Sequence, residues 1–353
     1  MVRGDRALLW DENGKEYIDA IGSLWYCQIG HGRTEMAEAI AAQVHTLETY
    51  STFDPFTNPL AEEVAAKVAS LSPIPDSRVF LCGSGSESID TAMKIARTSQ
   101  IQSGHPERTV IITRNRGYHG TNYGGTSAQG LPLNKIGYGT LLEGVIQVDA
   151  DDIEAMSIAF EKNKGNVAAI IAEPVQGAGG VWPSNTEYLA SLRRLCDDNG
   201  AYLIFDEVMT GFRVALGGAQ SLQGITPDLT CLGKVMGGGM PMAAFGGRKD
   251  IMSKLAPLGN VYQAGTLSGN PVAVAAGLKT LEIISRAGFY ETLTGQTEKL
   301  MTGLKQAADE AGIPFAVDSV GGMFGFYFAD QIPTSFEAVT KTDIEAFKKF
   351  FHL

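Results

Sequence analysis

The sequence contains no run of 18 or more apolar residues, the length that a membrane-spanning helix requires. Its first 17 residues, MVRGDRALLWDENGKEY, lack the apolar core of a signal peptide. Of the 353 residues, 44% are hydrophobic and 19% are charged. This composition predicts a globular protein with no membrane partner, long enough for one large domain and a smaller one.

Positive charge is also in short supply. The chain has 28 Lys and Arg residues against 39 Asp and Glu residues, which gives a net charge of −11. The basic residues form neither a block nor a stripe along the sequence. Nucleic acids and anionic membrane surfaces are therefore poor candidates for partners.

Cysteine is scarce as well, and its four residues are too far apart for a CxxC motif or a metal-ligand spacing. Two of the four lie in apolar, strand-like contexts. The sequence therefore predicts buried free thiols, no metal site and a reducing, cytoplasmic location. The four are Cys27, Cys82, Cys196 and Cys231.

The pattern of apolar residues predicts an α/β fold. Residues 7–20 read as two short strands joined at Asn13-Gly14, a hairpin signal. Near-continuous apolar runs then alternate with helical segments, which is typical of a largely parallel sheet covered on both faces. The runs expected to be strands are residues 78–82, 109–113, 167–174, 201–207, 228–232 and 242–247.

The texture changes after about residue 285, where a long helix, the run GGMFGFYF and a final helix near Asp343 follow. We expect three parts: an N-terminal hairpin segment (1–33), a large ligand-binding domain (34–284) and a small α/β domain (285–353). The chain stops within the amphipathic pattern FKKFFHL, so the small domain is expected to be incomplete.

Polar residues follow several of the expected strands, at the sheet edge where α/β proteins bind ligands. Ser84, Gly85 and Ser86 lie between a strand and a helix, a suitable cradle for a phosphate. Asp206 ends a buried strand and needs a cationic partner there. Lys234 also follows a strand, where poor hydration would lower the pKa of its amine. Each feature alone has an ordinary structural explanation.

Together these features match the needs of pyridoxal phosphate. Lys234 would bond to the cofactor's aldehyde, and Asp206 would keep its ring nitrogen protonated. Tyr118 would cover one face of the ring and Val208 the other, with His119 nearby. Glycines 237–239, after Lys234, would let the backbone pass close to that bond.

The chain resembles the class III aminotransferases of fold type I, through the ordered motifs SGSES, YHG, AEPVQGAGG, FDEVMTGFR, LGKVMGGG and AGTLSGNP. The resemblance implies a pyridoxal-phosphate enzyme with Lys234 and Asp206 in these roles. It implies that Thr266 reaches the cofactor phosphate of a second subunit in a homodimer with shared sites. It also places Glu173 and Gln176 beside the cofactor, and Trp25 in the substrate pocket.

The two halves of the chain resemble different members of this family. Residues 1 to about 205 are similar to omega-transaminases, and the rest to glutamate-1-semialdehyde aminomutase. Aminomutases have an Asn near Ala178, where this chain reads QGAGG, and the arginines that bind substrate carboxylates in either group are missing. The chain could be a mosaic or a fragment.

The first hypothesis is a transaminase that moves an amino group from an amine or amino acid to a keto acceptor. The alternative is the aminomutase, which moves nitrogen within one molecule to give 5-aminolevulinate. A folded but catalytically silent protein is the third possibility. The roles of His119, Glu207 and Arg213 stay open: His119 could only orient its neighbours, and Arg213 could anchor a lid or a substrate carboxylate.

Overall fold

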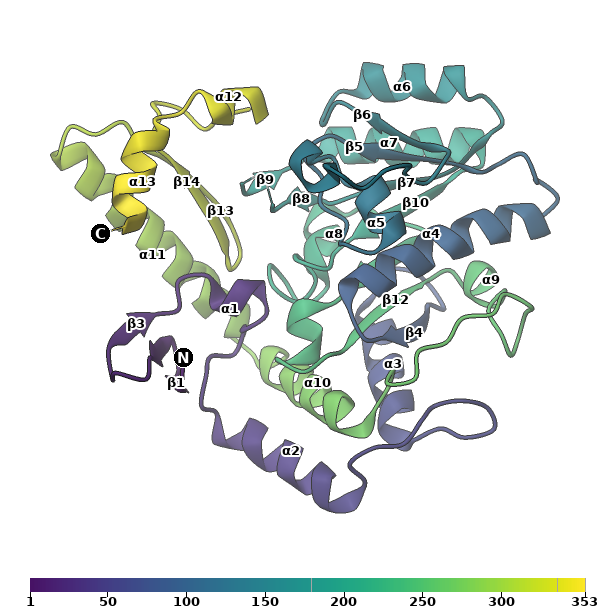
Figure 1. The fold of residues 1–353 in the computed structure, drawn as a ribbon, viewed down its shortest axis with the longest axis horizontal. Helices are drawn as coiled ribbons and strands as arrows, with labels where there is room; N and C mark the ends of the chain where they lie inside the picture. The colour runs from purple at the N-terminus through teal and green to yellow at the C-terminus, as the bar shows by residue number, and fades with distance from the viewer. Residues whose placement is uncertain (179, 335, 353) are drawn as a thin grey trace.

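The computed structural model describes residues 1–178, 180–334 and 336–352. Its centre is a seven-stranded sheet of order β4-β12-β11-β10-β7-β5-β6 (Figure 1). Only β12 runs antiparallel to its neighbours, so the predicted α/β fold with a mainly parallel sheet is confirmed. The strands are β4 (Arg78–Cys82), β5 (Val110–Arg114), β6 (Val145–Val148), β7 (Val167–Ala172), β10 (Tyr202–Asp206), β11 (Leu229–Leu232) and β12 (Ala243–Gly247).

Helices cover both faces of this sheet, as the continuous apolar strands predict. Along β7, Ala169 and Ile171 pack towards α4 (Gly85–Gln102). The alternate residues Ile170 and Ala172 pack towards α6 (Ile153–Lys162) and α7 (Thr186–Asn199). Every residue of β7 is therefore buried, which explains why the strand lacks a polar alternation.

Local signals in the sequence set several helix ends. Asn58 accepts a hydrogen bond from the backbone of Ala61 at the start of α3 (Pro59–Leu71). The proline at the first helical position loses no hydrogen bond there. At the C-terminal end of α7, Gly200 adopts the left-handed conformation (φ 65°) that glycine tolerates best.

The sequence pattern does not predict strand β6, because VIQV is short and lies between a glycine-rich stretch and acidic residues. It pairs with β5 at the edge of the sheet, and its pairing partner, not its own pattern, marks it as a strand. Cys82 and Cys231 are buried in the core and form no disulfide, as expected. Among the described residues, no helix is long and apolar enough to cross a membrane.

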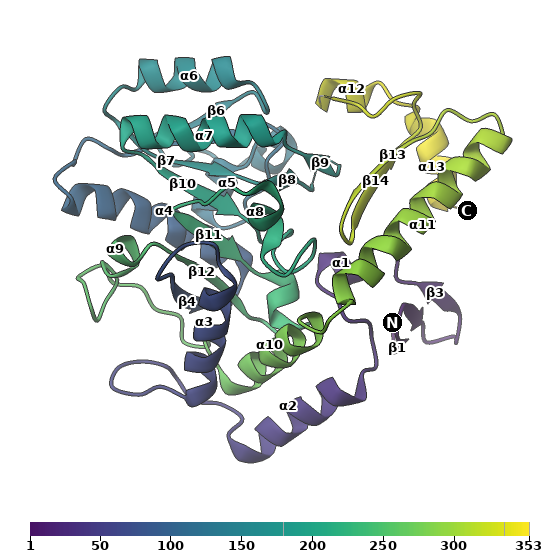
Figure 2. The same cartoon turned by 180° about the vertical axis from the view of Figure 1, so that it is seen from behind.

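The remaining elements lie at the two ends of the chain and around the sheet. The predicted hairpin forms β2 and β3, which pair in a small sheet with β1. In Figures 1 and 2 the C-terminal elements α11 to α13 form a group to one side of the large sheet. The bounds are β1 (Arg3–Asp5), β2 (Leu8–Trp10), β3 (Glu16–Ile18), α1 (Gly22–Trp25), α2 (Thr34–Thr46), α5 (Tyr123–Ala128), η1 (Pro132–Lys135), β8 (Val175–Gln176), β9 (Trp182–Pro183), α8 (Gly218–Gln223), η2 (Lys234–Gly237), α9 (Lys249–Met252), α10 (Pro271–Ile284), α11 (Phe289–Glu310), β13 (Ala316–Val320), β14 (Met323–Tyr327), α12 (Phe336–Thr340) and α13 (Ile344–His352).

Candidate active site

Four strands of the large sheet bring the predicted polar residues to one edge. Strands β4, β5, β10 and β11 run in the same direction, so their carboxyl ends meet there. A cavity of about 160 Å³ lies at this edge. It is lined by Ser84, Gly85, Ser86, Ile89, Tyr118, His119, Gly120, Glu173, Asp206, Val208, Met209 and Lys234.

Asp206 ends β10 with its carboxylate held on both oxygens. Its Oδ2 lies 2.8 Å from Nδ1 of His119, and its Oδ1 accepts a hydrogen bond from the backbone of Val208 at 3.0 Å. The exposed fractions are 5% for Asp206 and 1% for His119. The buried carboxylate therefore has the cationic or hydrogen-bonding partner that the sequence requires, and its direction is fixed by His119.

Lys234 lies two residues beyond β11, in a backbone conformation with φ 46° that is rare for a residue with a side chain. Its amine makes no hydrogen bond or ion pair with any described residue. Burial lowers the pKa of Lys234, and the charge of Arg213 lowers it further, while Asp206 and Glu173 raise it. Burial is the largest of these effects, so the balance shifts towards the neutral, nucleophilic form of the amine.

The turn from β4 into α4 has the properties of an anion cradle. Ser84 accepts a hydrogen bond from the backbone of Glu87, but no described residue accepts one from the backbone N–H of Gly85 or Ser86. These two groups start an 18-residue helix, where the dipole also favours negative charge. A Cβ on Gly85 would lie 2.5 Å from Cγ1 of Val208, so glycine is needed for this close approach.

Glu173 forms hydrogen bonds that hold in place the loop carrying Tyr118, whose ring lines the cavity. Its Oε1 accepts a hydrogen bond from the backbone of Tyr118 at 2.7 Å, and its Oε2 accepts one from Gly177 at 3.3 Å. Burial raises the pKa of Glu173, and the nearby charge of Asp206 contributes in the same direction. Burial likewise raises the pKa of Tyr118.

Three residues that the resemblance links to the site do not line this cavity. Trp25 packs against Arg213, whose guanidinium carbon lies 5.6 Å from the centre of the Trp25 ring. Gln176 is buried and donates to the backbone oxygen of Asn115. Thr266 is exposed on the loop before α10. Within the described part of the chain, Thr266 is not among the residues that line the cavity.

The expected role of the three glycines after Lys234 is wrong. None of them lines the cavity. A Cβ on Gly238 (φ 58°) would lie 2.2 Å from Oγ1 of Thr280, so this glycine lets the turn pack against α10. Gly237 likewise faces the backbone of Met242. Gly237 and Gly238 therefore serve the packing of the turn that carries the lysine, whereas a Cβ on Gly239 would meet no atom within 4 Å.

Sequence reasoning gave no role to Ile89, Gly120 and Met209, which also line the cavity. Gly120 has φ 87°, and a Cβ there would lie 2.6 Å from Oγ of Ser86. The sequence signal for Gly120 is its position directly after Tyr118 and His119. Met209 follows Asp206 by three residues, and only the path of the loop shows that its side chain returns to the cavity.

Glu207 lies next to Asp206 but points away from the cavity, into the loop that follows β10. Its carboxylate accepts hydrogen bonds from Oγ1 of Thr210 and from the backbones of Ala219 and Gln220, each at 2.7 Å. It is fully buried, and burial raises its pKa from 4.5 to about 7. Glu207 therefore fixes the start of α8 to the end of β10.

This carboxyl group should make stability depend on pH. Because its pKa is higher in the folded protein, stability should fall as the pH rises from 4.5 to about 7, by roughly 3 kcal/mol in total. Glu207→Gln cannot titrate, so its free energy of unfolding in urea should fall less between about pH 5 and about pH 8. The exposed Glu161→Gln is the control and should behave as the parent. An unchanged pH dependence in Glu207→Gln would contradict this account.

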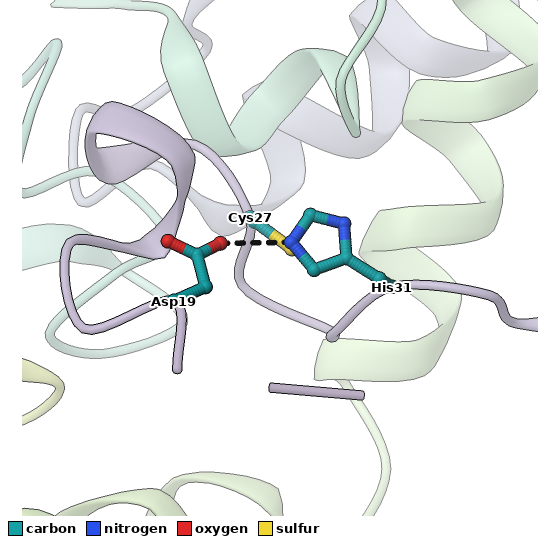
Figure 3. Close-up of side chains that lie close together, drawn as sticks. All are labelled: Asp19, Cys27 and His31. Atoms are coloured by element: carbon teal, nitrogen blue, oxygen red, sulfur yellow. Dashed lines mark hydrogen bonds and ion pairs between the residues drawn. The ribbon is translucent and has the colours of Figure 1, made fainter. Parts of the chain in front are cut away.

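Outside the cavity, the N-terminal segment brings together three side chains of the kinds that bind metals (Figure 3). Ligand atoms of Asp19, Cys27 and His31 lie within 4.8 Å of one another. Asp19 and His31 already bond to each other at 2.8 Å, and Ser23 donates to Asp19. Burial raises the pKa of Cys27, which disfavours the thiolate that metals bind. The hydrogen bond between Asp19 and His31 joins the two ends of the segment 19–31, and we call this pair the clasp.

Comparison with known proteins agrees with this geometry. The sequence model of the family described as aminotransferase class-III matches residues 1–348. The chain belongs to the class-III aminotransferases. It is therefore a pyridoxal-phosphate-dependent enzyme, and the family and cofactor predictions are confirmed.

Among the relatives of this class-III chain are both kinds of enzyme that its sequence resembles. It is 52% identical to a glutamate-1-semialdehyde 2,1-aminomutase of Polynucleobacter asymbioticus, over 98% of this chain and 80% of that protein. It is 32% identical to an (S)-enantioselective omega-transaminase from Thermomicrobium roseum, with a TM-score of 0.86 over 93% of this chain and 77% of the other. A PLP-bound amine transaminase from an uncultivated Pseudomonas species is 31% identical, with a TM-score of 0.83 over 91% and 78%.

The cavity of this class-III enzyme fits the cofactor. The two unpaired N–H groups at the start of α4 suit its phosphate, and the glycine there lets Val208 approach the same turn closely. The unpartnered amine of Lys234 suits its aldehyde, and the anchored carboxylate of Asp206 suits its ring nitrogen.

Proposed function

We propose that this enzyme moves an amino group within one molecule, as a glutamate-1-semialdehyde aminomutase. The observation that carries the proposal is the 52% identity to such an enzyme over 98% of the chain. The sequence patterns alone favour a transaminase first and the aminomutase second, and this identity reverses that order. The match between the second half of the chain and the aminomutases supports the same choice.

The proposed roles follow from the chemistry of the residues around the cavity. Lys234 holds the cofactor covalently, and Ser84, Gly85 and Ser86 bind its phosphate. Asp206 pairs with its ring nitrogen and is oriented by His119. Tyr118 and Val208 line the cavity and would pack against the ring. Glu173 holds the backbone of Tyr118 in place.

When bound, pyridoxal phosphate supplies an aldehyde that bonds to amines and a ring that accepts electrons. The carboxylate of Asp206 would lie beside the ring nitrogen and favour the protonated ring. Burial lowers the pKa of Lys234, so its amine Nζ would be suited to take a proton from substrate carbon and to return it. The same lysine therefore binds the cofactor and moves the proton.

An assay with a single substrate tests the proposal. Purified enzyme with pyridoxamine phosphate or pyridoxal phosphate and glutamate-1-semialdehyde alone should form 5-aminolevulinate over many turnovers. An intramolecular transfer consumes no acceptor, so added keto acids should leave the rate unchanged. If product forms only when an amino donor or a keto acceptor is added, the aminomutase proposal fails.

Intermolecular transamination is the second candidate, favoured by the similarity to omega-transaminases of known structure. It shares the roles of Lys234 and Asp206 and differs in the substrates. Trp25, which follows the omega-transaminase pattern, supports it. The same assay decides, because a transaminase needs both a donor and an acceptor.

We further propose a homodimer in which Thr266 reaches the cofactor phosphate of the second subunit. Thr266 lies on an exposed loop, and its neighbour Leu267 is 68% exposed. Other large apolar side chains are also exposed, which supports burial against a second copy. They include Tyr50, Phe53, Phe56, Leu133, Ile136, Tyr138 and Tyr262.

A further inference from the structure

Arg213 is a buried cation without a matching acid. Three arginines are more than nine-tenths buried: Arg114, Arg116 and Arg213. The first two form ion pairs with Asp151. Arg213 forms no ion pair with any described residue, although removing a guanidinium from water is costly unless a counter-charge is present. Asp19 and Cys27 act on Arg213 without forming an ion pair with it, so a direct anionic partner is missing among the described residues.

One edge of its guanidinium is free. Nη1 of Arg213 donates to Oε1 of Gln28 at 3.0 Å. No described residue accepts a hydrogen bond from Nε or Nη2, and Nε is fully buried. These two groups lie side by side on the guanidinium and match the two oxygens of a carboxylate. Beside Nη2 lies Gly22, where a Cβ would come within 2.9 Å, so glycine leaves space beside Nη2.

The guanidinium is held in place on several sides. Gln28 also donates to the backbone oxygen of Arg213, and Trp25 lies against the guanidinium. Tyr290 donates to the backbone oxygen of Phe212, and Glu207 ties the start of this loop to α8. The clasp between Asp19 and His31 closes the segment that carries Trp25 and Gln28 (Figure 3). Such fixing favours selective recognition, because little freedom remains to be lost on binding.

Arg213 also belongs to the surroundings of the reactive amine. It lies on the loop that directly follows Asp206, and its charge acts on Lys234. Met209 of the same loop lines the cavity and also packs in the apolar cluster that contains Trp25. A substrate with its amine at Lys234 could thus extend past Met209 towards Arg213.

We propose that Arg213 binds the carboxylate of the substrate, so that the enzyme selects amino acids over simple amines of the same length. This inference rests on the proposed amino transfer at Lys234. It assigns the carboxylate anchor to the loop after β10, next to the reacting centre.

Two amines that differ only in the carboxylate test this assignment. Calorimetry on the holoenzyme measures the binding of 4-aminopentanoate and of 2-aminopentane, and the cofactor absorbance follows one half-reaction with each. Arg213→Met should weaken binding of 4-aminopentanoate by about 10- to 100-fold, since a charge-assisted pair is lost. Binding of 2-aminopentane should change by less than about threefold.

A charge-conserving variant completes the test. Arg213→Lys keeps the charge but loses the paired N–H groups, so it should weaken 4-aminopentanoate by about 3- to 10-fold and leave 2-aminopentane unchanged. This variant decides the question if Arg213→Met does not fold. Equal losses for both amines, or no loss for either, would overturn the assignment. A holoenzyme that binds 4-aminopentanoate through Arg213 but yields no 5-aminolevulinate would refute only the aminomutase proposal.

Discussion

Replacing Lys234 with alanine should abolish turnover, with a loss of at least about 10⁴-fold. The variant lacks both the amine that attaches the cofactor and the group that moves the proton, and proton transfer alone contributes about 10²- to 10⁴-fold. Treatment of the parent enzyme with borohydride should fix the cofactor to the peptide that contains Lys234. In Lys234→Ala, peptide mass mapping should find no modified lysine.

Lys164→Ala is the matched control, because Lys164 is exposed on the surface. It should keep the activity of the parent and the modified Lys234. Attachment of the cofactor to a different lysine would refute the role of Lys234. A parent protein that takes up no pyridoxal phosphate would instead support the catalytically silent alternative.

Replacing Asp206 with asparagine should lower turnover by about 10²- to 10⁴-fold while the cofactor stays attached to Lys234. The amide keeps the size of the side chain but has no negative charge to hold a proton on the ring nitrogen. His119 also loses its charged partner 2.8 Å away. Steady-state rates measure the loss, and borohydride fixation shows whether attachment survives.

Asp228→Asn provides the control for removing a buried carboxylate. Asp228 is 4% exposed and forms ion pairs with Arg193 and Arg248, at the opposite end of the strands. Its variant should be less stable, yet its folded fraction should turn over at the rate of the parent. Near-parental turnover in Asp206→Asn would contradict the role given to that carboxylate.

The strands and their order of appearance were largely predictable, since both faces of the sheet are covered and each strand is a continuous apolar run. The exceptions are instructive. The pairing partner of β6 lies on β5, more than 30 residues earlier, and its own four residues carry too little pattern. That β12 runs against its neighbours also depends on how the chain returns after Lys234, which no local pattern records.

The candidate site divides in the same way. Asp206, Lys234 and the serine-glycine turn are visible in the sequence because polar residues at the ends of apolar strands need a reason. The neighbouring Glu207 and Asp206 are alike in sequence, but successive side chains of a strand point in opposite directions. One therefore lines the cavity and the other anchors α8.

The sequence by itself determined the chemistry: most of the strands, the residues that end them, and the presence of a lysine, an acid and a phosphate cradle in one chain. Only the tertiary structure decided which of these groups share a cavity, that Gly237 and Gly238 serve packing, and that Arg213 has an unpaired edge. The physical reason is distance along the chain. Strand ends and caps depend on neighbouring residues, whereas burial and the pairing of charges depend on segments such as residues 19–31 and 207–217, which meet only when the chain is folded.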